Sequence, residues 1–105
     1  MIADTIVAQC TPSGSGALAL IRVSGSEALD IVTRSATLSS NIPFSSIDSH
    51  TIHYGQVTDR DGKTIDQVMF LIMHAPKTFT GEQTVEITCH NNPFIIKHIL
   101  ERLIL

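Results

Sequence analysis

Seven residues near the end of the chain, Thr84–His90, alternate polar and apolar side chains without a break, and a turn signal at Thr80–Glu82 precedes them. Successive side chains of a β-strand point to opposite faces. Glu86, Thr88 and His90 therefore share one face, and the intervening Val, Ile and Cys share the other. Because a carboxylate and an imidazole on one face can both reach one cleft, this stretch predicts a half-buried strand with a recognition surface.

Four further apolar runs predict strands. They cover residues 4–10, 17–23, 51–57 and 67–73, and the second has the composition of a strand buried on both faces. Asp61-Gly62 between the third and fourth runs is a strong hairpin signal. The serine-rich segment 37–49 is expected to be a loop.

Two helices are predicted from their N-terminal signals. Ser24 with Glu27 forms a capping-box pattern before one helix, and Asn92 followed by Pro93 caps the other. The order ββαβββα is typical of an α+β domain, with a mixed or antiparallel sheet and helices packed on it. Residues 1–105 are expected to form a single domain. Because the last helix runs into Leu103-Ile-Leu105 without a stop signal, we expect a longer parent protein.

Composition narrows the function classes. A formal charge of −3 argues against a strong electrostatic grip on nucleic acid by this chain alone. No apolar run reaches the roughly 18–20 residues of a membrane helix, and no secretory signal is visible, so a cytoplasmic protein without membrane contact is expected. Cys10 and Cys89 lack metal-ligand spacing, and we expect reduced thiols and no metal site.

Two motifs could suggest a phosphate-binding loop or a metal site, but their sequence context argues against both. Gly14 and Gly16 precede a strand rather than a helix, which favours a plain connection over a phosphate loop, and no G-x-x-x-x-G-K-[ST] sequence is present. His50 and His53 would point to opposite faces of one strand. No nucleophile and base form a convincing pair, so no catalytic residue is predicted and the visible chemistry is binding.

Arg22, Glu86 and His90 are the candidate site residues, and each has a structural alternative. Arg22 interrupts an apolar strand, so it either forms an ion pair, with Glu86 or Asp66, or presents a planar donor to a ligand. Glu86 is either the acid of an ion pair or an acceptor for the adjacent N–H groups of a planar heterocycle. His90 is a base, a ligand contact or a satisfied framework residue.

Seven short motifs together carry a resemblance to a known family. They are Asp4-Thr-Ile-Val-Ala, Thr11-Pro12, Gly14-x-Gly16, Ile21-Arg-Val-Ser-Gly25, Ala75-Pro76, Phe79-Thr-Gly-Glu82 and Val85-Glu-Ile-x-Cys-His90. In this order, and over essentially the whole chain, they resemble the N-terminal domain of the MnmE (TrmE) family of tRNA-modification GTPases.

The resemblance implies a function that the residues alone do not give. Such domains look like the folate-binding unit of the glycine-cleavage T protein, bind 5-formyl-tetrahydrofolate as a one-carbon source and form homodimers. The parent proteins are cytoplasmic GTPases that modify the wobble uridine of tRNA with the flavoprotein MnmG (GidA). GTP, Mg²⁺ and potassium belong to the GTPase domain of that family, which this sequence lacks.

On the motifs of the resemblance, Arg22 and Glu86 match the family's folate contacts. Two departures bear on them. The family usually reads Cys-His-Gly-Gly where this chain has Asn91 and Asn92 after His90, and Pro-Pro-Gly-x-Gly-Gly where it has Pro12-Ser-Gly-Ser-Gly-Ala17. Asparagine tolerates the backbone angles of glycine but adds a side chain, which implies weaker or altered folate binding.

Two other functions compete with folate binding. One is a dimerisation module with a vestigial folate pocket. The other is a stand-alone one-carbon transferase like the T protein, for which the chain lacks a second half and a clear acid–base pair.

Overall fold

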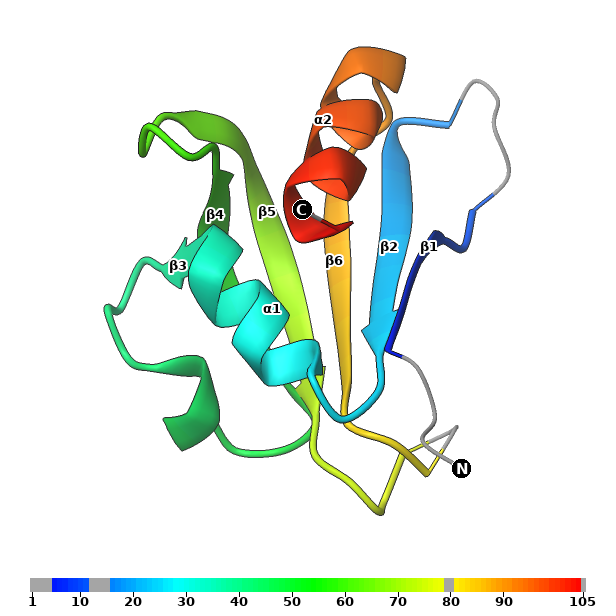
Figure 1. Cartoon of the computed structure of the whole chain (residues 1–105), viewed down its shortest axis with the longest axis vertical. Helices are drawn as coiled ribbons and strands as arrows, with labels where there is room; N and C mark the ends of the chain where they lie inside the picture. Colours follow the sequence, from blue (N-terminus) through cyan, green and yellow to red (C-terminus); the bar gives the residue numbers. More distant parts are fainter. Residues whose placement is uncertain (1–4, 12–15, 79–80, 105) are drawn as a thin grey trace.

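The computed structural model describes residues 5–11, 16–78 and 81–104. Within these residues the chain forms six strands, two α-helices and one 3-10 turn (Figure 1). In chain order they are β1 (Ile6–Gln9), β2 (Leu18–Ser24), α1 (Ala28–Ser35), β3 (Ala36–Leu38), η1 (Phe44–Ser46), β4 (Thr51–Thr58), β5 (Thr64–Met73), β6 (Thr84–His90) and α2 (Pro93–Ile104). The strands form one sheet in the order β1-β2-β6-β5-β4-β3, and every neighbouring pair is antiparallel. The predicted α+β class is confirmed, with an antiparallel sheet.

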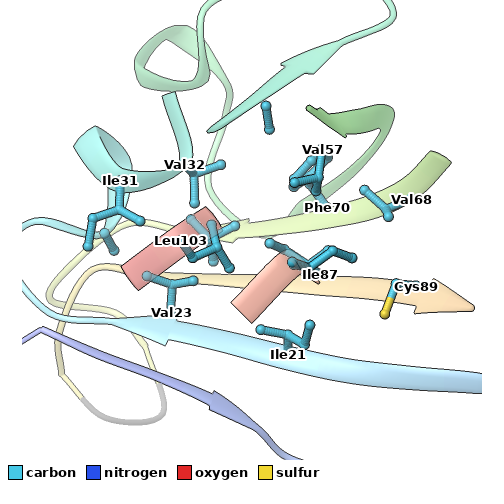
Figure 2. Packing of buried hydrophobic residues seen from close by; sticks show 14 of the residues in the cluster. Ile21, Val23, Ile31, Val32, Val57, Val68, Phe70, Ile87, Cys89 and Leu103 are labelled. Carbon is cyan, nitrogen blue, oxygen red and sulfur yellow. The ribbon is translucent and has the colours of Figure 1, made fainter. Parts of the chain in front are cut away.

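The hydrophobic core lies between the sheet and the two helices, which cover the same face (Figure 1). Ile21, Ile87 and Phe70 follow one another across the middle of the sheet and are fully buried. Val32 of α1 and Leu103 of α2 belong to the same buried cluster as this row (Figure 2). Alternate strand residues supply this layer, as the period of two requires.

The last helix begins as its sequence predicts. The Asn92 side-chain oxygen accepts hydrogen bonds from the backbone N–H groups of Phe94 and Ile95, at 2.9 and 3.2 Å. These are two of the donors that the first turn of a helix leaves without partners. The Asp61-Gly62 hairpin is also confirmed, with Gly62 at φ +84°.

The capping box predicted for the first helix is wrong. Ser24 ends β2, and its hydroxyl bonds to Glu82 at 3.1 Å and to Thr84 at 3.3 Å instead of capping a helix. The chain then turns at Gly25, at φ +141°, and the helix starts only at Ala28, with no side-chain cap. Ser24 therefore belongs to the sheet, where it pairs with β6, and does not cap the helix as the local pattern predicted.

A strand occurs where a loop was expected. Residues 36–38 follow α1 directly and pair with residues 55–57 of β4, so the observed order is ββαββββα rather than ββαβββα. Close contact makes this pairing possible, because a Cβ on Gly55 would lie 2.3 Å from the carbonyl oxygen of Thr37. The strand is three residues long, too short to show a period.

The second strand is buried on one face only, which corrects the prediction of burial on both. Ala19, Ile21 and Val23 face the helices and are buried, whereas Leu18 is exposed and Leu20 and Arg22 are half-buried. The sheet therefore has a face that neither helix covers, and we call it the open face. Its side chains include Ile6, Ala8, Leu18, Leu20, Arg22, Ile52, Tyr54, Met69, Leu71, Glu86 and Thr88, and the register places Gln56, Gln67 and His90 on it as well.

The open face is largely apolar even though it is accessible to solvent. Ile6, Leu18, Ile52, Tyr54 and Met69 are all classed among the exposed large hydrophobic residues. Exposed apolar residues gathered on one face mark an interaction site more often than a solvated face. Neither described helix has the length and hydrophobicity needed to cross a lipid bilayer.

Candidate binding site on the open sheet face

Arg22 and Glu86 meet on the open face. Arg22 of β2 and Glu86 of β6 are directly opposite each other in the antiparallel register, on the second and third strands of the sheet. The Nε and Nη2 atoms of Arg22 both donate to Oε2 of Glu86, at 2.9 and 2.5 Å. Of the two partners considered for Arg22, the structure therefore selects Glu86 over Asp66.

The environment of this pair favours the charged state of the arginine. Its hydrogen bond to Glu86 raises the pKa of Arg22 above the ordinary value, and burial opposes this shift only in part. The carboxylate is the more enclosed partner, since the Glu86 side chain is 14% exposed and that of Arg22 35%. A half-buried carboxylate with a charged partner is stable in the fold without any ligand.

The second oxygen of Glu86 has a different environment. Both Arg22 nitrogens contact Oε2, and within the described part of the chain Oε1 has no hydrogen-bond partner. An ionised carboxylate offers about four lone-pair sites, so Oε1 can accept further N–H donors. The structure thus supplies one oxygen to a ligand rather than the matched pair that the sequence suggested.

A hollow of about 260 Å³ opens beside this carboxylate. It is lined by Leu20, Ile52, Met69, Leu71, Glu86 and Thr88, which come from β2, β4, β5 and β6. The lining is mainly apolar, with one charge and one hydroxyl. Apolar walls with a few fixed polar groups are the usual composition of a small-molecule site. This arrangement can take a flat, apolar ring whose edge carries N–H donors.

His90 lies outside this hollow and has its own carboxylate partner. The imidazole Nδ1 is 2.8 Å from Oδ1 of Asp66, and the backbone N–H of His90 donates to Oδ2 at 2.9 Å. Asp66 is buried, so these contacts satisfy a carboxylate that would otherwise be costly. The sequence suggested Asp66 as a partner for Arg22, but in the structure Asp66 bonds to His90 instead.

The two asparagines that depart from the family pattern also lie away from the hollow. Asn92 caps α2, and the side-chain amide of Asn91 donates to the carbonyl oxygen of Gly16 at 2.6 Å. Asn91 lines a second, apolar groove of about 340 Å³ between α2 and the edge of β1. The other departure from the family pattern spans Pro12 to Ala17, and only Gly16 and Ala17 of it are described. Residues 12–15, which include Gly14, lie outside the described residues, and so does the turn residue Thr80.

The cysteines and the acidic and histidine side chains form no further site in the described part of the chain. Both cysteines are free thiols, with Cys10 exposed and Cys89 buried. Within residues 5–11, 16–78 and 81–104, no three His, Cys, Asp or Glu side chains come together as metal ligands would. The open face and its hollow are therefore the strongest candidate site of the described structure.

Comparison with known proteins shows the family to which the chain belongs. The sequence model described as "GTP-binding protein TrmE N-terminus" matches residues 5–105. The chain belongs to the TrmE N-terminal family. The match covers β1 to α2, so the whole described sheet, including Arg22 and Glu86, lies within the TrmE N-terminal region.

Individual relatives extend the comparison. Proteins named "tRNA modification GTPase MnmE" are 48% identical over 101 residues in Christiangramia forsetii, 46% over 101 residues in Chlamydia caviae and 42% over 99 residues in Geobacillus thermodenitrificans. These alignments cover 93–96% of this chain but only 21–22% of each relative. The TrmE N-terminal sequence described here therefore spans about a fifth of the length of those proteins.

Proposed function

We propose that this domain binds 5-formyl-tetrahydrofolate and forms a homodimer through its open face. It would do so as the N-terminal part of a cytoplasmic GTPase that modifies tRNA together with the flavoprotein MnmG. Membership of the TrmE N-terminal family supports the parent function. The single observation that supports the ligand is the Glu86 carboxylate at the wall of an apolar hollow.

The residues present fit a reduced folate. The pyrimidine half of its reduced pterin is planar and carries adjacent N–H donors along one edge. Leu20, Ile52 and Leu71 can contact the faces of the ring, and Oε1 of Glu86 can accept from its edge. When bound, the folate would supply a one-carbon unit, while the residues of this chain bind and orient it.

The exposed apolar residues of the open face support self-association. Ile52, near the start of β4, is 62% exposed, and Tyr54 and Met69, which face each other across β4 and β5, are also exposed on this face. A second copy of the same face would cover these side chains, as in the isologous interface of a two-fold dimer. The paired charges of Arg22 and Glu86 leave little net charge on the patch to oppose this contact.

Calorimetric titration of 5-formyl-tetrahydrofolate into the chain tests the ligand. The wild-type chain is expected to bind, and Glu86→Gln to bind at least about tenfold more weakly, because it loses a charge-assisted hydrogen bond. Glu101→Gln, which removes an exposed carboxylate from α2, is the matched control and should bind normally. Wild-type binding that Glu86→Gln leaves unchanged would remove Glu86 from the site.

The Arg22–Glu86 ion pair also supports a second candidate, a dimerisation module with a vestigial pocket. Two mutually satisfied charges need no ligand to be stable in the fold. That function predicts a dimer in light scattering that gives no heat with folate. The same titration, run at concentrations where the dimer is formed, separates the two.

A further inference from the structure

We propose that the groove between α2 and β1 is a docking site for a further strand, which pairs parallel to β1. The strand comes from the polypeptide that follows this domain in a longer protein of the family. The groove lies at the edge of the sheet and not on the open face. The inference therefore goes beyond the proposed function and does not depend on folate binding or on the proposed dimer.

One wall of the groove is an apolar stripe along the side of α2. Its members are spaced by three and four positions, so they lie on one side of the helix. They are Pro93, Ile96, Leu100 and Ile104. The groove has a volume of about 340 Å³, and Ile104 at the end of the stripe is 65% exposed. The structure thus presents an apolar helix surface that the described sheet does not cover.

The other wall is β1, whose outer edge faces no partner strand in the described part of the chain. The N–H of Cys10 donates to the carbonyl oxygen of Leu20 on β2, at 2.7 Å. Because hydrogen-bonded residues alternate along an antiparallel strand, the backbone groups of Val7 and Gln9 point away from β2. The Gln9 side chain also lines the groove. An open strand edge beside an apolar groove is suited to the addition of an extended segment.

The handedness of strand crossovers favours this edge over the edge at β3. A strand that follows β6 and α2 in the same sheet closes a βαβ unit, and about 98% of such units are right-handed. When the helices are in front and β6 runs upward, a right-handed crossover leads to the right, where β2 and β1 lie (Figure 1). Both β1 and β6 are antiparallel to β2, so the added strand is parallel to β1.

The relatives indicate where the added strand comes from. The matched family is described as the TrmE N-terminus, and the alignments cover only 21–22% of each relative. A chain that continues past α2 leaves the helix beside Ile104, which lines the groove. The tether gives the continuing segment a high effective concentration at the groove, which a separate molecule lacks. Alternate apolar side chains of this segment would face α2 and fill the groove.

Hydrogen exchange at the outer edge of β1 tests the docking. Mass spectrometry of short peptides that cover β1 compares the longer protein with the 105-residue chain. In the longer protein, the N–H groups of Val7 and Gln9 are expected to exchange at least about tenfold more slowly, because they gain partners. Equal exchange in the two proteins would overturn the proposal. Protection that develops in the 105-residue chain as its concentration rises would identify a second copy as the occupant and would also overturn it.

Ile104→Glu tests the groove in the longer protein with a variant that keeps the fold, because Ile104 is 65% exposed in the domain itself. A charge in the groove is expected to abolish the protection of Val7 and Gln9, because the docked strand would bury it. Phe94→Glu is the matched control, since Phe94 is 83% exposed on α2 but does not line the groove. It should leave the protection unchanged. Full protection in Ile104→Glu, or an equal loss in Phe94→Glu, would overturn the assignment of the groove.

Discussion

Cys89 and Cys10 are both free thiols, but the surroundings of their sulfur atoms differ. Cys89 is buried under the helices, and burial, with a smaller contribution from the charge of Asp66, raises the pKa of its thiol from 9.0 to about 11. The thiolate is therefore disfavoured in the folded protein relative to the unfolded chain. Cys89 acts as a small core residue rather than as a nucleophile.

The raised pKa of Cys89 predicts a loss of stability at high pH. The contribution of this thiol is fully present below pH 9 and is lost as the pH rises to 11, because the unfolded chain releases the proton first. Relative to Cys89→Ala, the free energy of unfolding of the wild type should fall by about 2 kcal/mol between pH 8 and pH 11. Urea unfolding at both pH values measures it, and a constant difference between the two proteins would contradict the assignment.

Gly55 is a residue whose side chain is excluded by a neighbouring strand. A Cβ would lie 2.3 Å from the Thr37 carbonyl oxygen and 3.0 Å from both the Leu38 Cα and a ring carbon of Phe70. Gly55→Ala is expected to destabilise the protein by about 2–3 kcal/mol by separating β3 from β4. Gly62→Ala is the control: it meets no atom within 4 Å and should cost only the strain of its positive φ, about 1 kcal/mol. Urea unfolding compares the two, and equal losses would exclude the contact as the cause.

At the scale of elements, α2 depends on its first turn. Asn92→Ala removes the acceptor for two backbone N–H groups and should lower the free energy of unfolding by about 1 kcal/mol. Asn92→Asp keeps an acceptor and places a negative charge at the helix N-terminus, so it should be neutral or stabilising. Thermal unfolding followed by circular dichroism gives the ranking, and a neutral Asn92→Ala would show that packing alone fixes this end.

The elements predicted correctly have signals that are local to them. Thr84–His90 shows its period of two, and Asn92 with Pro93 shows its cap, so β6 and the start of α2 follow from the sequence. Ser24 carries a local capping signal too, but pairing with Thr84 on β6 overrides it. The short strand β3 depends on contact with Gly55, which no local pattern records.

The candidate site was predictable in its residues but not in its geometry. An arginine and a glutamate in two apolar strands were evident, yet only the register of β2 against β6 makes them partners. Asp66 was an equal candidate for Arg22 in the sequence, and strand pairing directs it to His90 instead. Long-range register, rather than residue type, is the missing information.

At the scale of the whole molecule, the two faces of the sheet differ in what covers them. The helices bury one face, and the other presents exposed apolar residues on strands that are otherwise well packed. Dimerisation through the open face is the corresponding proposal, and it predicts which surface substitutions change the oligomeric state.

Ile52→Lys is expected to convert the dimer to a monomer, because it places a charge among the exposed apolar residues of the open face. Phe94→Lys is the matched control, since Phe94 is 83% exposed but lies on α2 on the covered side. It should leave the dimer intact. Light scattering over a range of concentrations gives the masses. If Phe94→Lys dissociated the dimer and Ile52→Lys did not, the interface would lie on the helices and not on the open face.

The pairing of β2 with β6 also determines when, during synthesis of the chain, the sheet can form. Arg22 and Glu86 are neighbours in the sheet but 64 residues apart in sequence. At about 5–20 residues per second, the ribosome needs several seconds to go from one to the other. During that time β2 can pair with β1 but not with β6, so the core row that contains Ile21 and Ile87 cannot form until β6 has been made.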